Sequence, residues 1–325
     1  MTFPERDSRR QDGVGTTDDG GALAELGRAL RSLHDGDRAA AEAVSLGTAA
    51  IPILRALLFE SDSAGIFEPR RRAALALAAL RAYDVLREFV ATWEPAADPV
   101  QRMGDEVALG AAARMLGGAP DPKVFAVLFA AARRHPVPGL IEALAHYRCA
   151  EAIPIFAKAL EDDLMRAAAE EALRRLGCDA LPALVEMASR TEIGPCGRET
   201  ASEIRRRQSA LNLIMELTLT ADLWQSLRAL VDHTDAEVAA LACRIGIAVA
   251  EDAEKRNCAQ KLVDLLERAK WPLRQEIEDC LSEHFASARE VVDRTLRDLA
   301  DNGTARSSIR RSLQKIQMKS SSSTA

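Results

Sequence analysis

The chain contains 325 residues, of which 48% are hydrophobic but only 4% aromatic, and its formal net charge is −6 at pH 7. A single globular core of this size would recruit more aromatic side chains, because each of them buries a large area. The composition therefore favours thin stacked layers over one core. The acidic balance disfavours duplex nucleic acid as a partner, since that partner selects strongly basic faces.

The two ends of the chain differ in composition from the middle. Residues 1–21 are polar and lack the apolar core of a secretory signal, and no stretch reaches the roughly 18–20 apolar residues that span a bilayer. We expect residues 1–21 to be a disordered leader and residues 22–300 to form one α-solenoid. Residues 301–325 should form a short basic helix and a disordered Ser-rich tail. These features predict a cytoplasmic protein with no membrane contact.

Apolar residues recur at helical spacing almost throughout the middle of the chain, and alternating strand patterns are nearly missing. An opening helix over 21–31 and a second helix near Arg38 are expected first. Helix pairs then follow at 49–59 with 69–83, 84–93 with 105–116, 122–134 with 138–147, 150–160 with 164–176, 180–189 with 200–217, 221–231 with 235–250, and 255–269 with 272–285. A last helix over 288–300 and the short basic helix complete the prediction.

Three short stretches are near-copies of one another: Ala-Ile-Pro-Ile-Leu at 50–54, Ala-Ile-Pro-Ile-Phe at 152–156 and Ala-Leu-Pro-Ala-Leu at 180–184. Each opens an apolar helix, and its proline suits a first helical turn, where the missing N–H costs nothing. The second copy is followed by a small-residue helix that stops at Gly177, for which we expect a left-handed conformation. The stretch from Pro154 to Pro182 is one complete helix-turn-helix unit, and self-similarity at this period indicates a stacked array of helix pairs.

These motifs resemble those of HEAT-repeat proteins, and most closely the short bacterial repeats of the phycobilisome-lyase type. The first-helix pattern Ala-x-Pro-x-Leu-x-x-Leu-Leu is matched at 50–58 and 152–160. The second-helix pattern, an Asp turn followed by Val-Arg and then x-x-Ala-Ala-x-Ala-Leu-x-x-Leu-Gly, is matched well at 162–177. The resemblance implies an all-α, right-handed α-solenoid of about seven HEAT-like pairs. The second helices of such an array would line its concave face.

Three arginines occupy the position where such repeats place a ladder of charges: Arg70, Arg166 and Arg206. Their expected partners are Asp62 and either Asp162 or Asp163. One interpretation is a structural ladder that bridges repeats and satisfies helix termini. The other is a row of arginines that grips an acidic partner through bidentate contacts.

Two runs of three arginines, at 70–72 and 205–207, could form either a solvated helix face or a phosphate-binding site. Consecutive residues point in different directions around a helix, so at most one or two of each run can face one ligand. We therefore favour a solvated helix face over a phosphate-binding site.

No motif for catalysis, for a cofactor or for a metal is recognised. The five histidines lack ligand spacing, and no His-Glu dyad of the HEAT-fold diiron hydroxylases occurs. The six cysteines contain no Cys-x-x-Cys pair and are expected to be reduced and mostly buried. Cys196 is the expected exception, because it lies in the insertion at 189–202, which is either a tolerated surface loop or a functional one.

The sequence therefore predicts a non-catalytic protein–protein interaction scaffold or adaptor that binds a protein on its concave helical face. The alternative is a chromophore-handling subunit like the phycobilisome lyases, or another HEAT-fold enzyme subunit. A nucleic-acid-binding array is a weaker third hypothesis. The repeat pattern does not specify the partner or the oligomeric state.

Overall fold

Helices make up all the regular secondary structure of the residues that the structure describes. This computed structural model describes residues 19–32, 34–118, 121–191, 198–217, 220–301 and 307–322. The predicted all-α fold class is confirmed for them. The first six α-helices are α1 (Asp19–Arg31), α2 (Gly36–Ser45), α3 (Ile51–Phe59), α4 (Glu68–Ala79), α5 (Tyr83–Thr92) and α6 (Pro99–Gly117). Twelve more follow: α7 (Pro122–Arg134), α8 (Pro138–Ala145), α9 (Ile153–Ala159), α10 (Arg166–Leu176), α11 (Leu181–Ser189), α12 (Ala201–Glu216), α13 (Ala221–Leu227), α14 (Ala236–Val249), α15 (Asp252–Leu265), α16 (Trp271–Glu283), α17 (Phe285–Asp301) and α18 (Ser307–Ser322).

Short 3₁₀ turns explain the three near-copies in the sequence. The turns Gly47–Ala50, Ala150–Ala152 and Gly177–Ala180 lead directly into α3, α9 and α11. Each of these helices carries a proline at one of its first two positions. The alanine that ends each turn is fully buried, which explains why this position carries a small side chain. The Ala-x-Pro pattern is therefore the entry into a first helix.

Each odd-numbered helix contacts the even-numbered helix that follows it, so the described helices form nine consecutive pairs. Seven of them, α3/α4 to α15/α16, are the predicted HEAT-like pairs. The helices predicted at the two ends also pair, as α1/α2 and α17/α18. Helix α6 starts earlier than predicted, because Asp98 caps it by accepting a hydrogen bond from the Gln101 N–H at 2.8 Å.

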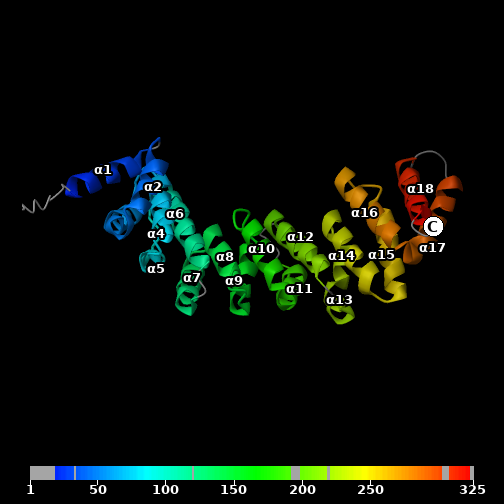
Figure 1. Cartoon of the computed structure of the whole chain (residues 1–325). Helices are drawn as coiled ribbons and strands as arrows, with labels where there is room; N and C mark the ends of the chain where they lie inside the picture. The colour runs from blue at the N-terminus through cyan, green and yellow to red at the C-terminus, as the bar shows by residue number, and fades with distance from the viewer. Residues whose placement is uncertain are drawn as a thin grey trace, which may run out of the picture. The chain divides into compact units, whose positions relative to one another are not determined.

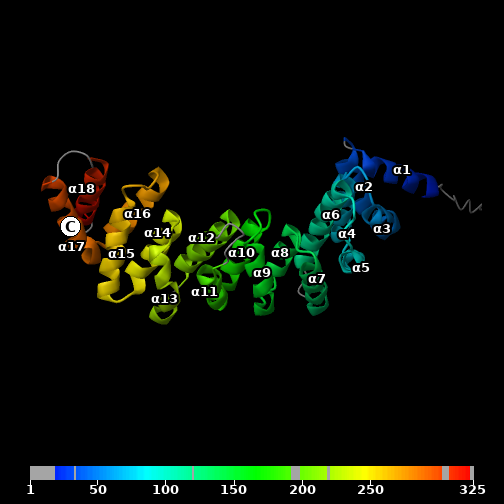
Figure 2. The ribbon, with the colours of Figure 1, turned by 180° about the vertical axis from the view of Figure 1, so that it is seen from behind.

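The chain divides into two compact units, Met1–Ala119 and Pro120–Ala325. In the first unit, α2, α4 and α6 contact one another in succession, as do α1, α3 and α5. In the second unit, α8, α10, α12, α14, α16 and α18 form such a row, and α9, α11 and α13 form the other (Figures 1 and 2). Leucine and alanine fill the core between the rows.

Both described ends of the chain are helical. Most of the predicted leader, residues 1–18, lies outside the described residues, and helix α1 begins at Asp19. The basic helix α18 is longer than predicted and runs to Ser322, into the segment predicted as a tail. Its apolar residues Ile309, Leu313 and Ile316 are buried against the preceding helices.

Gly177, between α10 and α11, has the positive φ that the sequence predicts, but not the left-handed helical conformation. Its φ is +62° and its ψ is −135°, a region of backbone space that is essentially restricted to glycine. A Cβ built at this position would meet nothing within 4 Å, so the constraint comes from the backbone alone.

We expect Gly177→Ala to lower the free energy of unfolding by about 1–3 kcal/mol, because alanine strains this backbone. Gly118→Ala is the matched control, because Gly118 also follows a helix and has open space but a φ of −78°. Urea denaturation followed by circular dichroism measures both variants. Equal midpoints for the two would show that the backbone at Gly177 accepts an alanine.

Candidate functional site

The three predicted arginines share one structural role, which is to cap the C-terminus of the preceding helix. They lie in or near the first turn of α4, α10 and α12. The Arg70 and Arg166 Nε atoms donate to the carbonyls of Leu58 and Leu160, both at 3.0 Å, and Arg206 Nη2 donates to the Arg190 carbonyl at 3.1 Å. The last carbonyls of a helix lack intrahelical partners, so each arginine caps the first helix of its own pair. Arg274 of α16, which the sequence analysis missed, does the same for the Leu266 carbonyl at 3.0 Å.

The acidic partners are only partly those predicted from the sequence. Arg166 pairs with Asp163 at 2.5 Å, as expected. Arg70 pairs with Asp105 of α6 rather than with Asp62, so that prediction was wrong. Asp62 instead accepts a hydrogen bond from the Ala64 N–H at 2.7 Å, within the loop between α3 and α4. A short side chain used inside its own turn is unavailable to a distant arginine.

Burial contradicts the solvated-face interpretation of the two arginine runs. The four side chains that are at most 6% exposed are Arg70, Arg72, Arg206 and Arg207, so only Arg71 and Arg205 face solvent. Arg206 pairs with Glu161 at 3.2 Å, and Arg72 pairs with Asp37 at 2.7 Å. These buried guanidiniums are bound within the chain, which favours the structural ladder over the gripping of an external partner.

The part of the insertion that the structure describes is anchored by an Arg–Glu–His cluster. The Glu199 carboxylate binds Arg207 and lies 2.7 Å from His233 Nε2. His233 Nδ1 accepts a hydrogen bond from the Asp235 N–H at 3.1 Å, so the neutral ring carries its proton on Nε2. Both ring nitrogens are therefore occupied. A pocket of about 750 Å³ beside this cluster includes Arg198, Glu199 and His233 in its lining. The predicted thiol of Cys196 lies outside the described residues.

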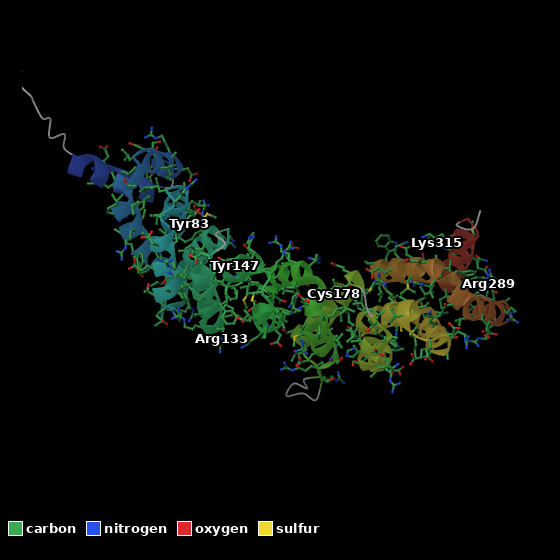
Figure 3. All side chains as sticks on the ribbon, turned by 60° about the horizontal axis from the view of Figure 1, so that its bottom comes forward. Tyr83, Arg133, Tyr147, Cys178, Arg289 and Lys315 are labelled. Carbon is green, nitrogen blue, oxygen red and sulfur yellow. The ribbon has the colours of Figure 1, made fainter. Side chains whose placement is uncertain are left out.

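The five described cysteines are free thiols. Cys243, Cys258 and Cys280 are buried, as expected, and burial raises the pKa of the Cys280 thiol to about 12. That thiol is therefore protonated at neutral pH. Cys178 was not predicted to be exposed, but it is (Figure 3), because it lies in the 3₁₀ turn between α10 and α11.

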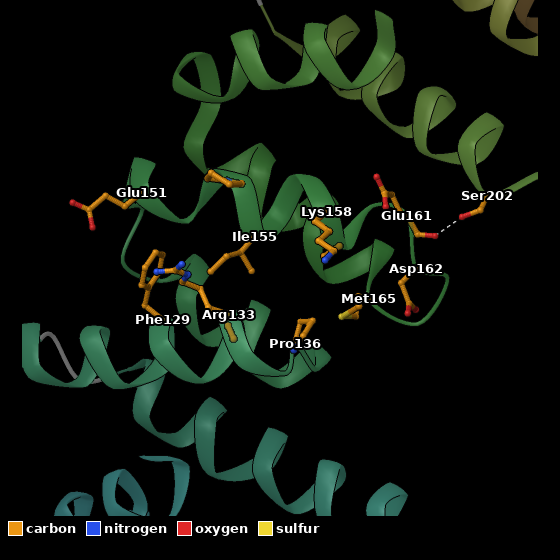
Figure 4. Close-up of a pocket in the computed structure, with 13 residues that line it drawn as sticks. Phe129, Arg133, Pro136, Glu151, Ile155, Lys158, Glu161, Asp162, Met165 and Ser202 are labelled. Atoms are coloured by element: carbon orange, nitrogen blue, oxygen red, sulfur yellow. Dashed lines mark hydrogen bonds between the residues drawn. The ribbon is translucent and has the colours of Figure 1, made fainter. Parts of the chain in front are cut away.

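A groove of the second unit lies between α7 and α9 and has a volume of about 780 Å³ (Figure 4). Its apolar lining comes from Phe129, Ala132, Pro136, Pro154, Ile155, Ala159 and Met165. Its charged lining comes from Arg133, Glu151, Lys158, Glu161 and Asp162. Ser202 closes one end and donates to the Glu161 carbonyl at 2.5 Å. In the loop beside the groove, Leu164 is 83% exposed.

A second groove lies on the row of even-numbered helices, between α12, α14 and α16. Its volume is about 420 Å³. Its apolar lining consists of Ile214, Met215, Leu217, Ile245, Ala248, Val249 and Cys280, and its polar lining of Arg244, Glu276, Asp279, Glu283 and His284. Three of the four charged side chains that line this groove are carboxylates.

The described residues contain no group of three or more His, Cys, Asp or Glu side chains that could hold a metal ion. None of their helices is both long enough and apolar enough to cross a membrane.

No protein-family model matches the sequence, and no curated protein matches it. Among solved structures, the chain is similar to human deoxyhypusine hydroxylase in complex with glycerol, with 16% sequence identity and a TM-score of 0.30. That match covers 84% of this chain and 97% of the hydroxylase chain. At this level of similarity it supports no conclusion about function.

Proposed function

We propose that this chain is a non-catalytic protein-interaction scaffold, and that its principal site is the groove between α7 and α9. The observation that carries the proposal is a large groove with an apolar lining, beside the almost fully exposed Leu164. Grooves of several hundred Å³ between helices, with apolar walls and a few charged groups, are typical binding sites. An exposed leucine at the edge of such a groove adds apolar surface that a partner can cover.

The charges of this groove indicate the chemistry of the partner. No carboxylate among the described residues pairs with Arg133 or Lys158, which extend from α7 and α9, whereas Glu161 is paired with Arg206. Asp162 accepts the N–H of Leu164 at 2.8 Å within its own turn. A peptide segment with apolar side chains and two carboxylates would fill the groove and neutralise the two cations.

The test combines affinity capture from the native cell with two matched charge reversals. The double variant Arg133→Glu/Lys158→Glu changes exposed side chains of the groove, and Lys123→Glu changes an exposed cation of α7 outside it. We expect the double variant to weaken binding of the captured partner by about 10- to 150-fold, because hydrogen bonds to charged groups contribute about 1.5–3 kcal/mol. Lys123→Glu should bind like the unmodified chain. Equal affinity for all three proteins would contradict the proposal.

The alternative functions predicted from the sequence stay predictions. A chromophore-handling role, as in phycobilisome lyases, rests on the resemblance of the repeats, and no described residue favours it. It would be supported by an absorbing complex on mixing with a bilin. A nucleic-acid-binding role would be supported by a salt-sensitive shift with DNA or RNA.

A further inference from the structure

The C-terminal helix α18 shows what kind of helix the even-numbered row accepts. Helix α18 packs beside α16 (Figures 1 and 2). Ile309, Leu313 and Ile316 form its buried face. Lys315, labelled in Figure 3, pairs with Glu278 at 2.6 Å, and four residues later Lys319 pairs with Asp279 at 2.7 Å. The acidic side of α16 therefore binds a basic amphipathic helix within the same chain.

The groove between α12, α14 and α16 lies next to this contact and also combines apolar side chains with carboxylates. Asp279 belongs both to the contact with α18 and to the groove, since it pairs with Lys319 and lines the groove. Ile245, Val249 and Cys280 supply apolar lining, as the neighbours of α18 do for its buried face. Met215 is partly exposed in this groove and lacks an apolar cover.

The unpaired charge of the groove favours a positively charged partner. Glu276 is half exposed and pairs with Arg244 at 2.7 Å, and Asp279 pairs with Lys319 at 2.7 Å. No cation among the described residues pairs with Glu283, which lies one turn along α16 from Asp279. A lysine or arginine of the partner would meet the Glu283 carboxylate, while an acidic segment would be repelled.

We infer that this groove, defined by α12, α14 and α16, binds a basic amphipathic helix of another protein. The helix inserts apolar side chains between α14 and α16 and places lysine or arginine against Glu283. The α18 helix of a second copy is a poorer occupant, because it is already packed against its own α16. The inference goes beyond the proposed function, since it assigns a second site with the opposite charge preference. Two such sites would let one chain bridge two partners.

The test uses two designed helical peptides that share their apolar positions and differ only in carrying lysine or glutamate at the charged positions. Fluorescence anisotropy with the full chain measures their affinities. We expect the lysine peptide to bind at least tenfold more tightly than the glutamate peptide. Its binding should weaken at least tenfold in Ala248→Arg, which fills the groove from an exposed position, and in Glu283→Lys. Ala126→Arg, at an exposed position of α7, is the matched control and should bind normally.

The inference is overturned if both peptides bind equally, if neither binds, or if Ala248→Arg binds the lysine peptide as the unmodified chain does. Circular dichroism shows that each variant is folded before its affinity is compared. Sedimentation velocity without peptide tests the other occupant: a dimer that Ala248→Arg abolishes would assign the groove to a second copy and also overturn the inference. The proposed function is tested separately, because Arg133→Glu/Lys158→Glu leaves this groove intact and should still bind the lysine peptide.

Discussion

Replacing Arg70 with methionine is expected to lower the free energy of unfolding by about 3–5 kcal/mol, the usual cost of removing one partner of a buried ion pair. The side chains of Arg70 and Asp105 are 7% and 8% exposed, and they pair across α4 and α6. Methionine fills similar space but leaves the Asp105 carboxylate buried without a cation. It also removes the donor to the Leu58 carbonyl, which lies 3.0 Å from Arg70 Nε. Both losses act in the same direction.

Two further variants separate the ion pair from other effects of the substitution. Arg71→Met, the next residue along α4, removes a partly exposed pair with Glu68 and should cost less than about 1 kcal/mol. Arg70→Met/Asp105→Leu removes both charges and should recover most of the lost free energy of unfolding, because an apolar pair of similar volume fills the site without a buried charge. Urea denaturation monitored by circular dichroism gives the three values. If Arg70→Met lowers the free energy of unfolding no more than Arg71→Met does, the pair of Arg70 with Asp105 is solvated.

Replacing Arg207 with methionine is expected to have a similarly large effect, also about 3–5 kcal/mol. Arg207 is fully buried and binds the Glu199 carboxylate together with the carbonyls of Ala188 and Arg190. Without it, Glu199 would keep His233 as its one partner among the described residues, and two carbonyls at the end of α11 would lose a donor. The damage should concentrate where the insertion meets α11 and α12.

The matched control is Arg205→Met, because Arg205 is exposed on the same turn and pairs with Asp163 at 3.0 Å. Arg205→Met should lower the free energy of unfolding by less than about 1 kcal/mol. Hydrogen exchange adds a local measurement. We expect faster exchange of amides at the end of α11 and the start of α12 in Arg207→Met, with α16 and α18 unchanged, since repeats contact mainly their neighbours. Uniform acceleration along the second unit would contradict this local role.

Local sequence signals determined the helices of this protein. The Ala-x-Pro entries, the helical apolar spacing and the glycine at 177 depend on interactions within a few residues, and the structure has seven pairs where these signals predict them. The sequence also indicated three of the four capping arginines, Arg70, Arg166 and Arg206, but it did not indicate Arg274. The sequence did not show that these arginines act as caps, because the carbonyl that each one binds belongs to the preceding helix.

Only the tertiary structure decided which charges are buried and where a partner could bind. Arg70 and Asp105 are 35 residues apart, and the sequence suggested the nearer Asp62 instead. Within each arginine run, the neighbouring helices determine which side chain is enclosed, so a pattern of consecutive cations appeared solvated when most of them are buried. The two grooves have the same origin. Each is formed by helices from different repeats, and its apolar lining and its charges converge only when those repeats stack.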